Sequence, residues 1–378
     1  FGGTSTRDGH FLCASKSYGI RTGETILEAQ RKCPSLVLVP PNYSLYEKCS
    51  TAFIEILREY SDVVEQYSID EAFVDMSTSC HLFGSPKEAA MSIKKRIREE
   101  LGFTVNVGVS SSKLLAKMAS DFQKPDRVHT LYPEEIKAKM WPLPVSKLFF
   151  VGKATTGKLL SLGIRTIGEL AGVDLAWLKS VLKKPGEMIW GFANGVDFSA
   201  VLAQPAANKG YGNSTTTPYD VTDMETAGQV LLALSETVGS RLRADRVQIR
   251  TVSVGIRYAD FSYASHQRKL PSSTDLTWEI YETACRLFRE LWNGRPIRHL
   301  RVHTGGIEGA DSGRQLSMFD EFDYEKLSRM DQTVDGMRNR LGSDAVMRAV
   351  FLNRPIDHMS GGITREKWSV NYEDMQIH

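Results

Sequence analysis

Apolar side chains recur at helical spacing along much of this chain. In residues 44–60, Leu45, Phe53, Ile56 and Leu57 fall on one face of a helix. A period of 3.6 residues predicts an amphipathic helix that packs onto a core. Helices are predicted over residues 24–32, 44–60, 87–101, 223–244, 275–293 and 323–341, with shorter ones over residues 158–162 and 167–171.

Strands are predicted where apolar and polar residues alternate. Alternation runs from Phe103 to Val109, before a run of serines that can cap a helix, and a strand, a turn and a strand are predicted from Val63 onward. Further strands are predicted over residues 247–258 and 298–304. The pattern therefore predicts a mixed sheet backed by helices, followed by a second α/β unit of about 100 residues.

Two segments interrupt the periodicity and predict domain boundaries. Residues 141–144 read Trp-Pro-Leu-Pro, and prolines break regular structure. Residues 203–210 are small and polar without periodicity, which is typical of an interdomain linker. We therefore expect the second α/β unit to begin after this linker.

Composition narrows the class of protein. The 378 residues are 42% hydrophobic and 24% charged, which is ordinary for a globular protein of several domains. We see no apolar run near the ~20 residues of a membrane span and no signal peptide, so we expect a soluble, cytoplasmic protein with no membrane partner. Five scattered cysteines without a CxxC motif argue against a zinc site or a disulfide framework. The net charge is only +2, so any nucleic-acid site must be local.

The stretch Tyr67–Asp75 places two adjacent carboxylates, Asp70 and Glu71, between apolar, strand-forming flanks. Side chains alternate along a strand, so the two acids can approach one ion only at a turn or a strand end. A hard cation such as Mg²⁺ takes carboxylate and phosphate oxygens as ligands. The pair therefore predicts a metal site, with a solvated hairpin tip as the alternative.

Two predicted strands of the second α/β unit each have one polar or cationic face. Hydroxyls, small residues and cations on an open sheet can follow a phosphate backbone without reading bases. A normal solvent-facing sheet is the alternative. The polar positions are Thr251, Ser253, Gly255 and Arg257 on the first strand and His299, Arg301 and His303 on the second.

Several segments, in the right order, resemble the Y-family DNA polymerases (the UmuC/DinB-like group), the translesion enzymes that include bacterial polymerases IV and V. The stretch YSIDEAFVDMS at residues 67–77 resembles the family signature. Residues 108–121, followed by Lys124-Pro125, resemble the family's strand-to-helix segment and its phosphate contact. The likeness runs from about Gly9 to about Gly306, and the tail beyond resembles the Gram-positive members.

The resemblance implies an α+β multidomain fold: a right-hand polymerase with a mixed-sheet palm, small fingers, a helical thumb and an α/β little-finger domain. The family's first strand, with a further metal-binding Asp and an aromatic steric gate, is expected upstream of Phe1. The segment Cys13–Ile20 is shorter than the family's fingers segment, so we assign no triphosphate contact there. The implied domains are partial fingers (1–41), palm (42–132), thumb (133–202), linker (203–210), little finger (211–306) and a C-terminal tail (307–378).

The resemblance makes Asp70 and Glu71 the catalytic residues and the ligands of two Mg²⁺ ions, for which Mn²⁺ can substitute. The ions would align a primer 3′-hydroxyl with the α-phosphate of an incoming nucleotide. Lys124 would meet the triphosphate as a point charge, with a solvated lysine beside a turn as the alternative. Lys113 and Lys117 are expected to be solvated or structural.

DNA contacts are implied in two places. Residues 151–164 resemble a helix-hairpin-helix, in which a Gly turn offers backbone N–H groups to a phosphate. Phe150 replaces the family's usual glycine there, and a plain packing turn is the alternative. The polar strands of the little finger are implied to follow DNA. The implied DNA-binding residues are Gly152, Lys153, Gly163, Thr251, Ser253, Arg257, Arg268, Lys269, Arg298, His299, Arg301 and His303.

The peptide at residues 315–319 resembles the Gln-Leu-x-Leu-Phe motif by which bacterial polymerases dock into the sliding clamp. Gln315 would be the polar anchor, and Leu316, Met318 and Phe319 would fill an apolar pocket. The alternative is a loop that packs onto its own domain. The helix predicted after this peptide is expected to be a packing helix.

These features predict a template-directed, error-prone translesion DNA polymerase that acts in DNA repair and damage tolerance. Its expected partners are primer-template DNA, deoxynucleoside triphosphates and the sliding clamp, and we expect a monomer. The alternative is a noncatalytic DNA- and clamp-binding scaffold of the same family, without a complete metal site. A cyclase with a similar palm is disfavoured, because it needs neither the basic sheet nor the clamp peptide.

Overall fold

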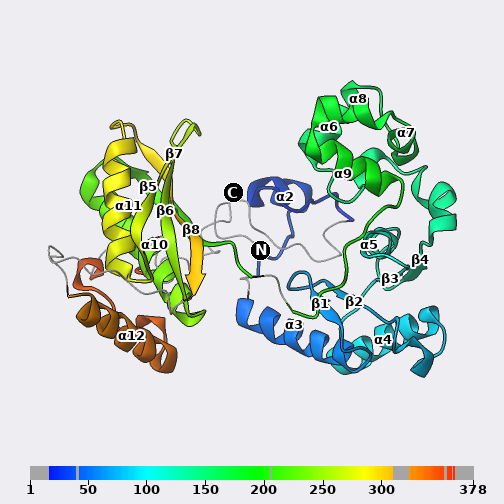
Figure 1. The fold of residues 1–378 in the computed structure, drawn as a ribbon, viewed down its shortest axis with the longest axis horizontal. Coiled ribbons are helices and arrows are strands. Elements are labelled where there is room, and N and C mark those ends of the chain that lie inside the picture. The colour runs from blue at the N-terminus through cyan, green and yellow to red at the C-terminus, as the bar shows by residue number, and fades with distance from the viewer. Residues whose placement is uncertain are drawn as a thin grey trace. The chain divides into compact units, whose positions relative to one another are not determined.

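The computed structural model describes residues 17–39, 42–204, 207–309, 323–352, 356–359 and 361. The chain divides into two compact units, and the division falls between residues 206 and 207, inside the predicted linker. Figure 1 shows the elements of each unit. No helix in the described ranges combines the length and the apolar character that crossing a membrane requires.

The first unit begins with three helices whose starts are set by capping side chains. Thr25, Asn42 and Ser85 each accept a hydrogen bond from a backbone N–H in the first turn of a helix. Gly102 ends the third helix in the left-handed conformation, with φ of 74°, which glycine adopts without a steric penalty. The helices are α2 (Ile26–Lys32), α3 (Tyr43–Arg58) and α4 (Pro86–Leu101).

Two pairs of short strands complete this part of the unit. Strand β1 (Val64–Gln66) pairs antiparallel with β2 (Ala72–Val74), and β3 (Val107–Val109) pairs parallel with β4 (Val128–Thr130). The two pairs are separate two-stranded sheets, one antiparallel and one parallel. The strand predicted from Phe103 is shorter than expected, because its partner β4 offers only three residues for pairing.

Helix α5 (Lys113–Ser120) joins the strands to a helical region. Its Leu114, Leu115 and Met118 are buried in the same hydrophobic core as the helices that follow. This shared core fixes α5 relative to that region. The helices are α6 (Lys153–Ser161), α7 (Ile167–Ala171), α8 (Leu175–Leu182) and α9 (Lys184–Ala193), and short 3₁₀ or π turns lie at Cys80–Leu82, Pro133–Glu135, Ile136–Met140 and Val145–Lys147.

The second unit is a four-stranded antiparallel sheet in the order β5-β8-β6-β7. Helices α10 and α11 pack against one face of it (Figure 1), where Val252, Val254, Leu300 and Val302 are buried. The alternate positions on each strand face away from these two helices. The elements are β5 (Gly210–Val221), α10 (Met224–Ala244), β6 (Val247–Tyr258), β7 (Tyr263–Thr274), α11 (Thr277–Leu291), β8 (Ile297–Gly309) and α12 (Tyr324–Leu341), with short turns at Ser343–Ala345 and Ala349–Phe351.

Helix α12 is held against α10 by buried ion pairs. Arg243 of α10 lies 3.1 Å from Asp331 and 2.6 Å from Asp335, and Arg338 of α12 lies 2.6 Å from Glu236 of α10. A buried pair that loses one partner leaves an uncompensated charge, so these contacts fix the helix in place. Helix α12 is thus a packing helix of the second unit, as the sequence predicts.

Candidate active site and nucleic-acid interface

The turn of the β1–β2 hairpin carries the acid pair. The backbone N–H groups of Tyr67 and Ser68 both donate to the carbonyl oxygen of Glu71, at 2.9 and 3.0 Å, and close the loop. The Ser68 hydroxyl donates to Asp70 Oδ1 at 2.7 Å. Asp70 is exposed and Glu71 is partly exposed. The strict alternation of a strand is interrupted here, which is the condition under which adjacent acids can serve one ion.

A chain of ion pairs connects Glu71 to Lys124. The ammonium of Lys117, on α5, lies 2.6 Å from Glu71 Oε1 and 3.3 Å from Asp121 Oδ2. Asp121 Oδ1 lies 2.7 Å from the ammonium of Lys124. The structure therefore links the predicted metal ligand to the predicted phosphate lysine. The sequence pattern did not indicate a role in this site for the two linking residues, Lys117 and Asp121.

These ion pairs keep both linking groups charged. Burial lowers the pKa of Lys117, but the contacts with Glu71 and Asp121 outweigh it and raise that pKa above its usual value. Burial likewise raises the pKa of Asp121, but the hydrogen bond from Lys124 and the charge of Lys117 outweigh it and lower that pKa. Lys117 is therefore a cation and Asp121 an anion at neutral pH.

The donors of the hairpin turn fit a hard divalent cation. Asp70 and Glu71 offer carboxylate oxygens, and Mg²⁺ is usually bound by one or two carboxylates together with waters and substrate phosphates. Among the residues that the structure describes, no three His, Cys, Asp or Glu side chains cluster as a metal site. Within the described residues, the turn therefore does not form a closed cage for a structural metal.

Lys113, one helical turn before Lys117, has a different partner. Its ammonium donates to both carboxylate oxygens of Glu65 on β1, at 2.7 Å each, and lies 4.9 Å from the centre of the Phe73 ring. Glu65 also accepts a hydrogen bond from the backbone N–H of Leu202 at 2.8 Å. Lys113 therefore ties α5 to the hairpin, in agreement with the structural role considered for it.

The turn before α6 keeps a left-handed residue where the family has glycine. Phe150 has φ of 68° and is 56% exposed, although such a conformation costs a non-glycine residue about 1–2 kcal/mol. Gly152 precedes the helix without a side-chain cap, and the exposed Lys153 is its first residue. Gly163 follows the helix with φ of 82°. The first N–H groups of α6 thus have no capping side chain, as a phosphate site at this helix end requires.

The strand register of the second unit assembles a polar face on the side of the sheet away from α10 and α11. No helix of the described residues packs on this side, which is called the uncovered face below. Four rows of residues cross it, and no position in them is acidic. Cations and hydroxyls therefore share one surface, which is the arrangement that backbone contacts to DNA need. The rows are Gly210, Gly305, Thr251 and Lys269; Gly212, His303, Ser253 and Gln267; Ser214, Arg301, Gly255 and Ser265; and Thr216, His299, Arg257 and Tyr263.

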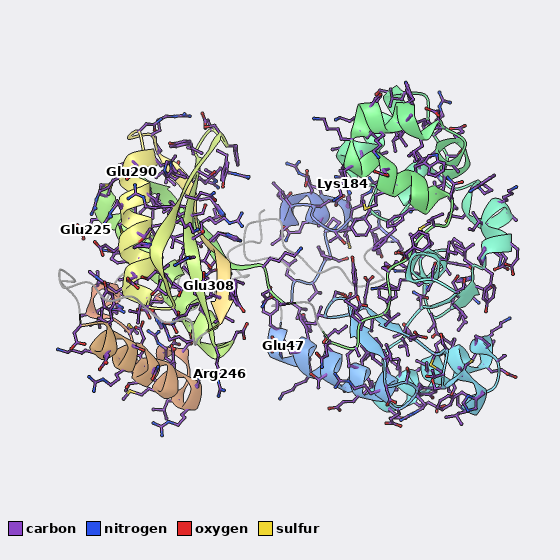
Figure 2. The ribbon with its side chains drawn as sticks, viewed as in Figure 1. Glu47, Lys184, Glu225, Arg246, Glu290 and Glu308 are labelled. Carbon is purple, nitrogen blue, oxygen red and sulfur yellow. The ribbon has the colours of Figure 1, made fainter. Side chains whose placement is uncertain are left out.

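Of the cations grouped with this face in the sequence, one lies on the opposite face and another falls at a register shift. Arg268 pairs with Val252 on the helix-covered face, and its guanidinium lies 2.7 Å from Glu290 of α11. Figure 2 labels Glu290 on this helix. Arg298 falls at a register shift of β8 and lies 3.7 Å from Asp220. Arg268 is therefore not brought to the uncovered face, because it is adjacent to Lys269 and side chains alternate along a strand.

Both histidines of the uncovered face are more acidic than usual. Burial lowers the pKa of His299, and the charges of Arg257 and Arg301 lower it further. Burial and the charge of Arg301 also lower the pKa of His303. Both imidazoles are therefore neutral at pH 7 in the free protein.

Tyr263 also lies on this face, although the sequence pattern did not indicate it. A Cβ on Gly255 would lie 2.6 Å from the Tyr263 hydroxyl, so the glycine leaves space for the tyrosine ring over the sheet. The ring is 56% exposed. Its place becomes apparent only once β7 is known to pair with β6.

Some predicted site residues lie outside the described residues. They are the clamp-motif residues Gln315, Leu316, Met318 and Phe319. Residues 13–16 of the shortened fingers segment, to which no contact was assigned, also lie outside the described residues.

Comparison with known sequences identifies the family. The impB/mucB/samB family matches residues 13–121, its C-terminal domain matches residues 208–318, and the helix-hairpin-helix motif of the same family matches residues 133–164. The DNA polymerase IV of Clostridium acetobutylicum is 42% identical, over 93% of this chain and 89% of that protein. The DNA polymerase IV 2 of Bacillus subtilis is 39% identical, over 93% of this chain and 87% of that protein. The chain therefore belongs to the impB/mucB/samB family, the Y family of DNA polymerases.

Solved structures show the same fold. A Y-family DNA polymerase chimera of Dbh and Dpo4 aligns with a TM-score of 0.65 at 22% identity, over 78% of this chain and 85% of that one. A structure described as an insertion ternary complex of Dbh DNA polymerase aligns with a TM-score of 0.54 at 23% identity, over 78% of this chain and 86% of that one. These matches confirm the predicted multidomain polymerase fold.

Proposed function

We propose that this Y-family polymerase extends primers on damaged templates by metal-dependent nucleotidyl transfer, with Asp70 and Glu71 as its catalytic carboxylates. The observation that supports the proposal is the chain of ion pairs from Glu71 to Lys124 through Lys117 and Asp121, because it connects the proposed metal ligand to the proposed triphosphate contact. The alternative of a solvated hairpin tip gives no reason for this connection.

The residues of this site have two proposed roles, metal binding and phosphate binding. Asp70 and Glu71 would hold divalent ions, with Mg²⁺ as the expected metal and Mn²⁺ as its substitute, and the metal would supply charge neutralisation at the transferring phosphate and activation of the primer hydroxyl. Lys124 is 56% exposed and bonded to Asp121, so its ammonium can exchange that partner for a phosphate oxygen. The hairpin hydrogen bonds hold the acid pair in place while substrates enter and leave.

The second unit would hold primer-template DNA through its uncovered face. Arg257, Lys269 and Arg301 supply charge, while Thr251 and Ser253 supply hydroxyls. Such contacts follow the phosphate backbone and do not read bases. The helix end at Gly152 and Lys153 would add a phosphate contact from the first unit. An enzyme that accepts any sequence needs this kind of binding.

The competing function is a DNA-binding scaffold without catalysis. Asp70→Ala separates the two, because Asp70 is exposed at the hairpin turn and its removal leaves the DNA face unchanged. We expect primer extension to be lost and the affinity for primer-template DNA to stay within about twofold of wild type. An equal loss of both would refute the metal role of Asp70, and unchanged extension would leave the acid pair without a catalytic task.

The clamp peptide is a separate part of the proposal. Removal of Leu316 and Phe319 should leave basal extension by the monomeric enzyme unchanged and abolish its stimulation by a bacterial sliding clamp. Support for this comes from the motif alone. Continued stimulation of the double variant would refute the docking role.

A further inference from the structure

We propose that Lys117 is a built-in competitor for the metal at Glu71. Its ammonium pairs with Oε1, one of the two carboxylate oxygens that can hold an ion, so a metal that takes this oxygen can bind only when the ion pair opens. The inference rests on the proposed function, because it assumes that Glu71 is a metal ligand. It adds a residue that controls how readily the site is filled.

The ion pair is placed to compete. The distance of 2.6 Å from Lys117 Nζ to Glu71 Oε1 leaves no space for a cation between the two atoms. The side chain of Lys117 is only 14% exposed, so its surroundings restrict it, whereas Glu71 is 38% exposed and within reach of ions from solvent. A metal at Glu71 would also repel the ammonium, because both are positive.

Asp121 gives Lys117 an alternative partner. Asp121 lies four residues later on the same helical face, and its Oδ2 is 3.3 Å from the same ammonium. When Glu71 binds a metal in place of Lys117, Lys117 can stay paired with Asp121, so its buried charge keeps a partner.

The same arrangement connects the metal to the nucleotide. Asp121 also holds Lys124, at 2.7 Å. If a triphosphate draws Lys124 away, Asp121 pairs with Lys117 only, and this ion pair becomes stronger. Nucleotide binding would therefore favour release of Glu71 to the metal.

Lys113 provides a matched control. It lies on the same helix, one turn earlier, and its side chain is also 14% exposed. It pairs with both oxygens of Glu65 and has no ion pair with Glu71. A general effect of removing a lysine from α5 would therefore appear in Lys113→Met as well as in Lys117→Met.

The test is Mn²⁺ binding measured by electron paramagnetic resonance of the free ion, without DNA or nucleotide. We expect Lys117→Met to bind Mn²⁺ about fivefold more tightly than wild type, as expected from the loss of a partly exposed ion pair. Lys113→Met and the charge-preserving Lys117→Arg should stay near wild type, and Glu71→Gln should bind more weakly. Circular dichroism checks the fold, and Lys117→Gln replaces Lys117→Met if the latter does not fold.

Two results would overturn the inference, and only the second would also refute the metal role of Glu71. If Glu71→Gln weakens Mn²⁺ binding but Lys117→Met binds no better than Lys113→Met, Glu71 is a ligand and Lys117 does not compete for it. If Glu71→Gln binds Mn²⁺ as wild type does, the metal role of Glu71 fails, and with it both the inference and this part of the proposed function.

Discussion

Lys269 and Arg268 are adjacent cations on β7 that lie on opposite faces of the sheet. Lys269 is opposite Thr251 on the uncovered face, whereas Arg268 is opposite Val252 and pairs with Glu290 on the face covered by helices. We predict that Lys269→Gln weakens the binding of primer-template DNA and that Arg268→Gln does not. The two substitutions remove the same charge from neighbouring positions, so each is the control for the other.

The size of the effect follows from counterion release. Each phosphate that a cation neutralises contributes about 0.9 to the slope of log K against log salt concentration. Lys269→Gln should therefore reduce that slope by about 0.9. The variant would then bind about eightfold more weakly than wild type at 0.1 M salt and equally well at 1 M. Arg268→Gln should retain the wild-type slope.

Fluorescence anisotropy of a labelled primer-template duplex, titrated at several KCl concentrations, measures both slopes. Repetition with unrelated DNA sequences should give the same loss for Lys269→Gln, because phosphate contacts are independent of sequence. Equal slopes for the two variants, or a larger change for Arg268→Gln, would refute the assignment of DNA to the uncovered face.

Three further predictions concern pH, the packing of α12 and the thumb turn. The affinity for primer-template DNA should rise as the pH falls from about 7.5 to 6. The pKa values of His299 and His303 are lowered in the free protein, and nearby phosphates raise them, so that DNA binding takes up protons. A His299→Asn, His303→Asn double variant should lose this pH dependence, and a flat wild-type profile would contradict the prediction. Arg338→Met should lower the free energy of unfolding in urea by about 2 kcal/mol, because Glu236 loses one of its two arginine partners and keeps Arg348. An unchanged curve would count against this. Phe150→Gly should be about 1 kcal/mol more stable in thermal unfolding than Phe150→Ala, because only glycine relieves the positive φ; the reverse order would show that the turn is unstrained.

Several helices were predicted well because their ends carry local signals, whereas α8 and α9 were not predicted. Helix α4 begins after Ser85, which caps it together with Glu88, and ends at Gly102 in the left-handed conformation. Both signals can be read in the sequence, and the observed bounds differ from the predicted ones by one residue. Helix α10 was also predicted, and it is buried in the core of the second unit along much of its length. In α12 the buried residues are Asp331 and Arg338, so its packing depends on ion pairs that apolar spacing does not indicate.

Strands β5 and β7 were not predicted because they lack apolar alternation. Strand β7 has a face of Tyr263, Ser265, Gln267 and Lys269, and its other face is stabilised in part by the ion pair of Arg268 with α11. Strand β5 consists largely of glycine, serine and threonine. Their formation depends on pairing with β6 and β8, which tertiary structure provides and local sequence does not encode.

The candidate site was predictable where it is a continuous motif. Asp70 and Glu71 are neighbours in the sequence, so the pair was found directly. The spacing of Lys117, Asp121 and Lys124 could have suggested a chain of ion pairs along one side of α5. The contact of Lys117 with Glu71 joins residues 46 apart, and only the fold brings them together.

Primer extension by this protein tests the central claim most directly. The reaction contains Mg²⁺, all four deoxynucleotides and either an undamaged template or one with an abasic site. We predict that the primer is extended on both templates. Extension should be lost when the metal is chelated and in the Asp70→Ala variant. Tight binding of primer-template DNA and clamp without any extension would contradict the claim and identify the protein as a scaffold.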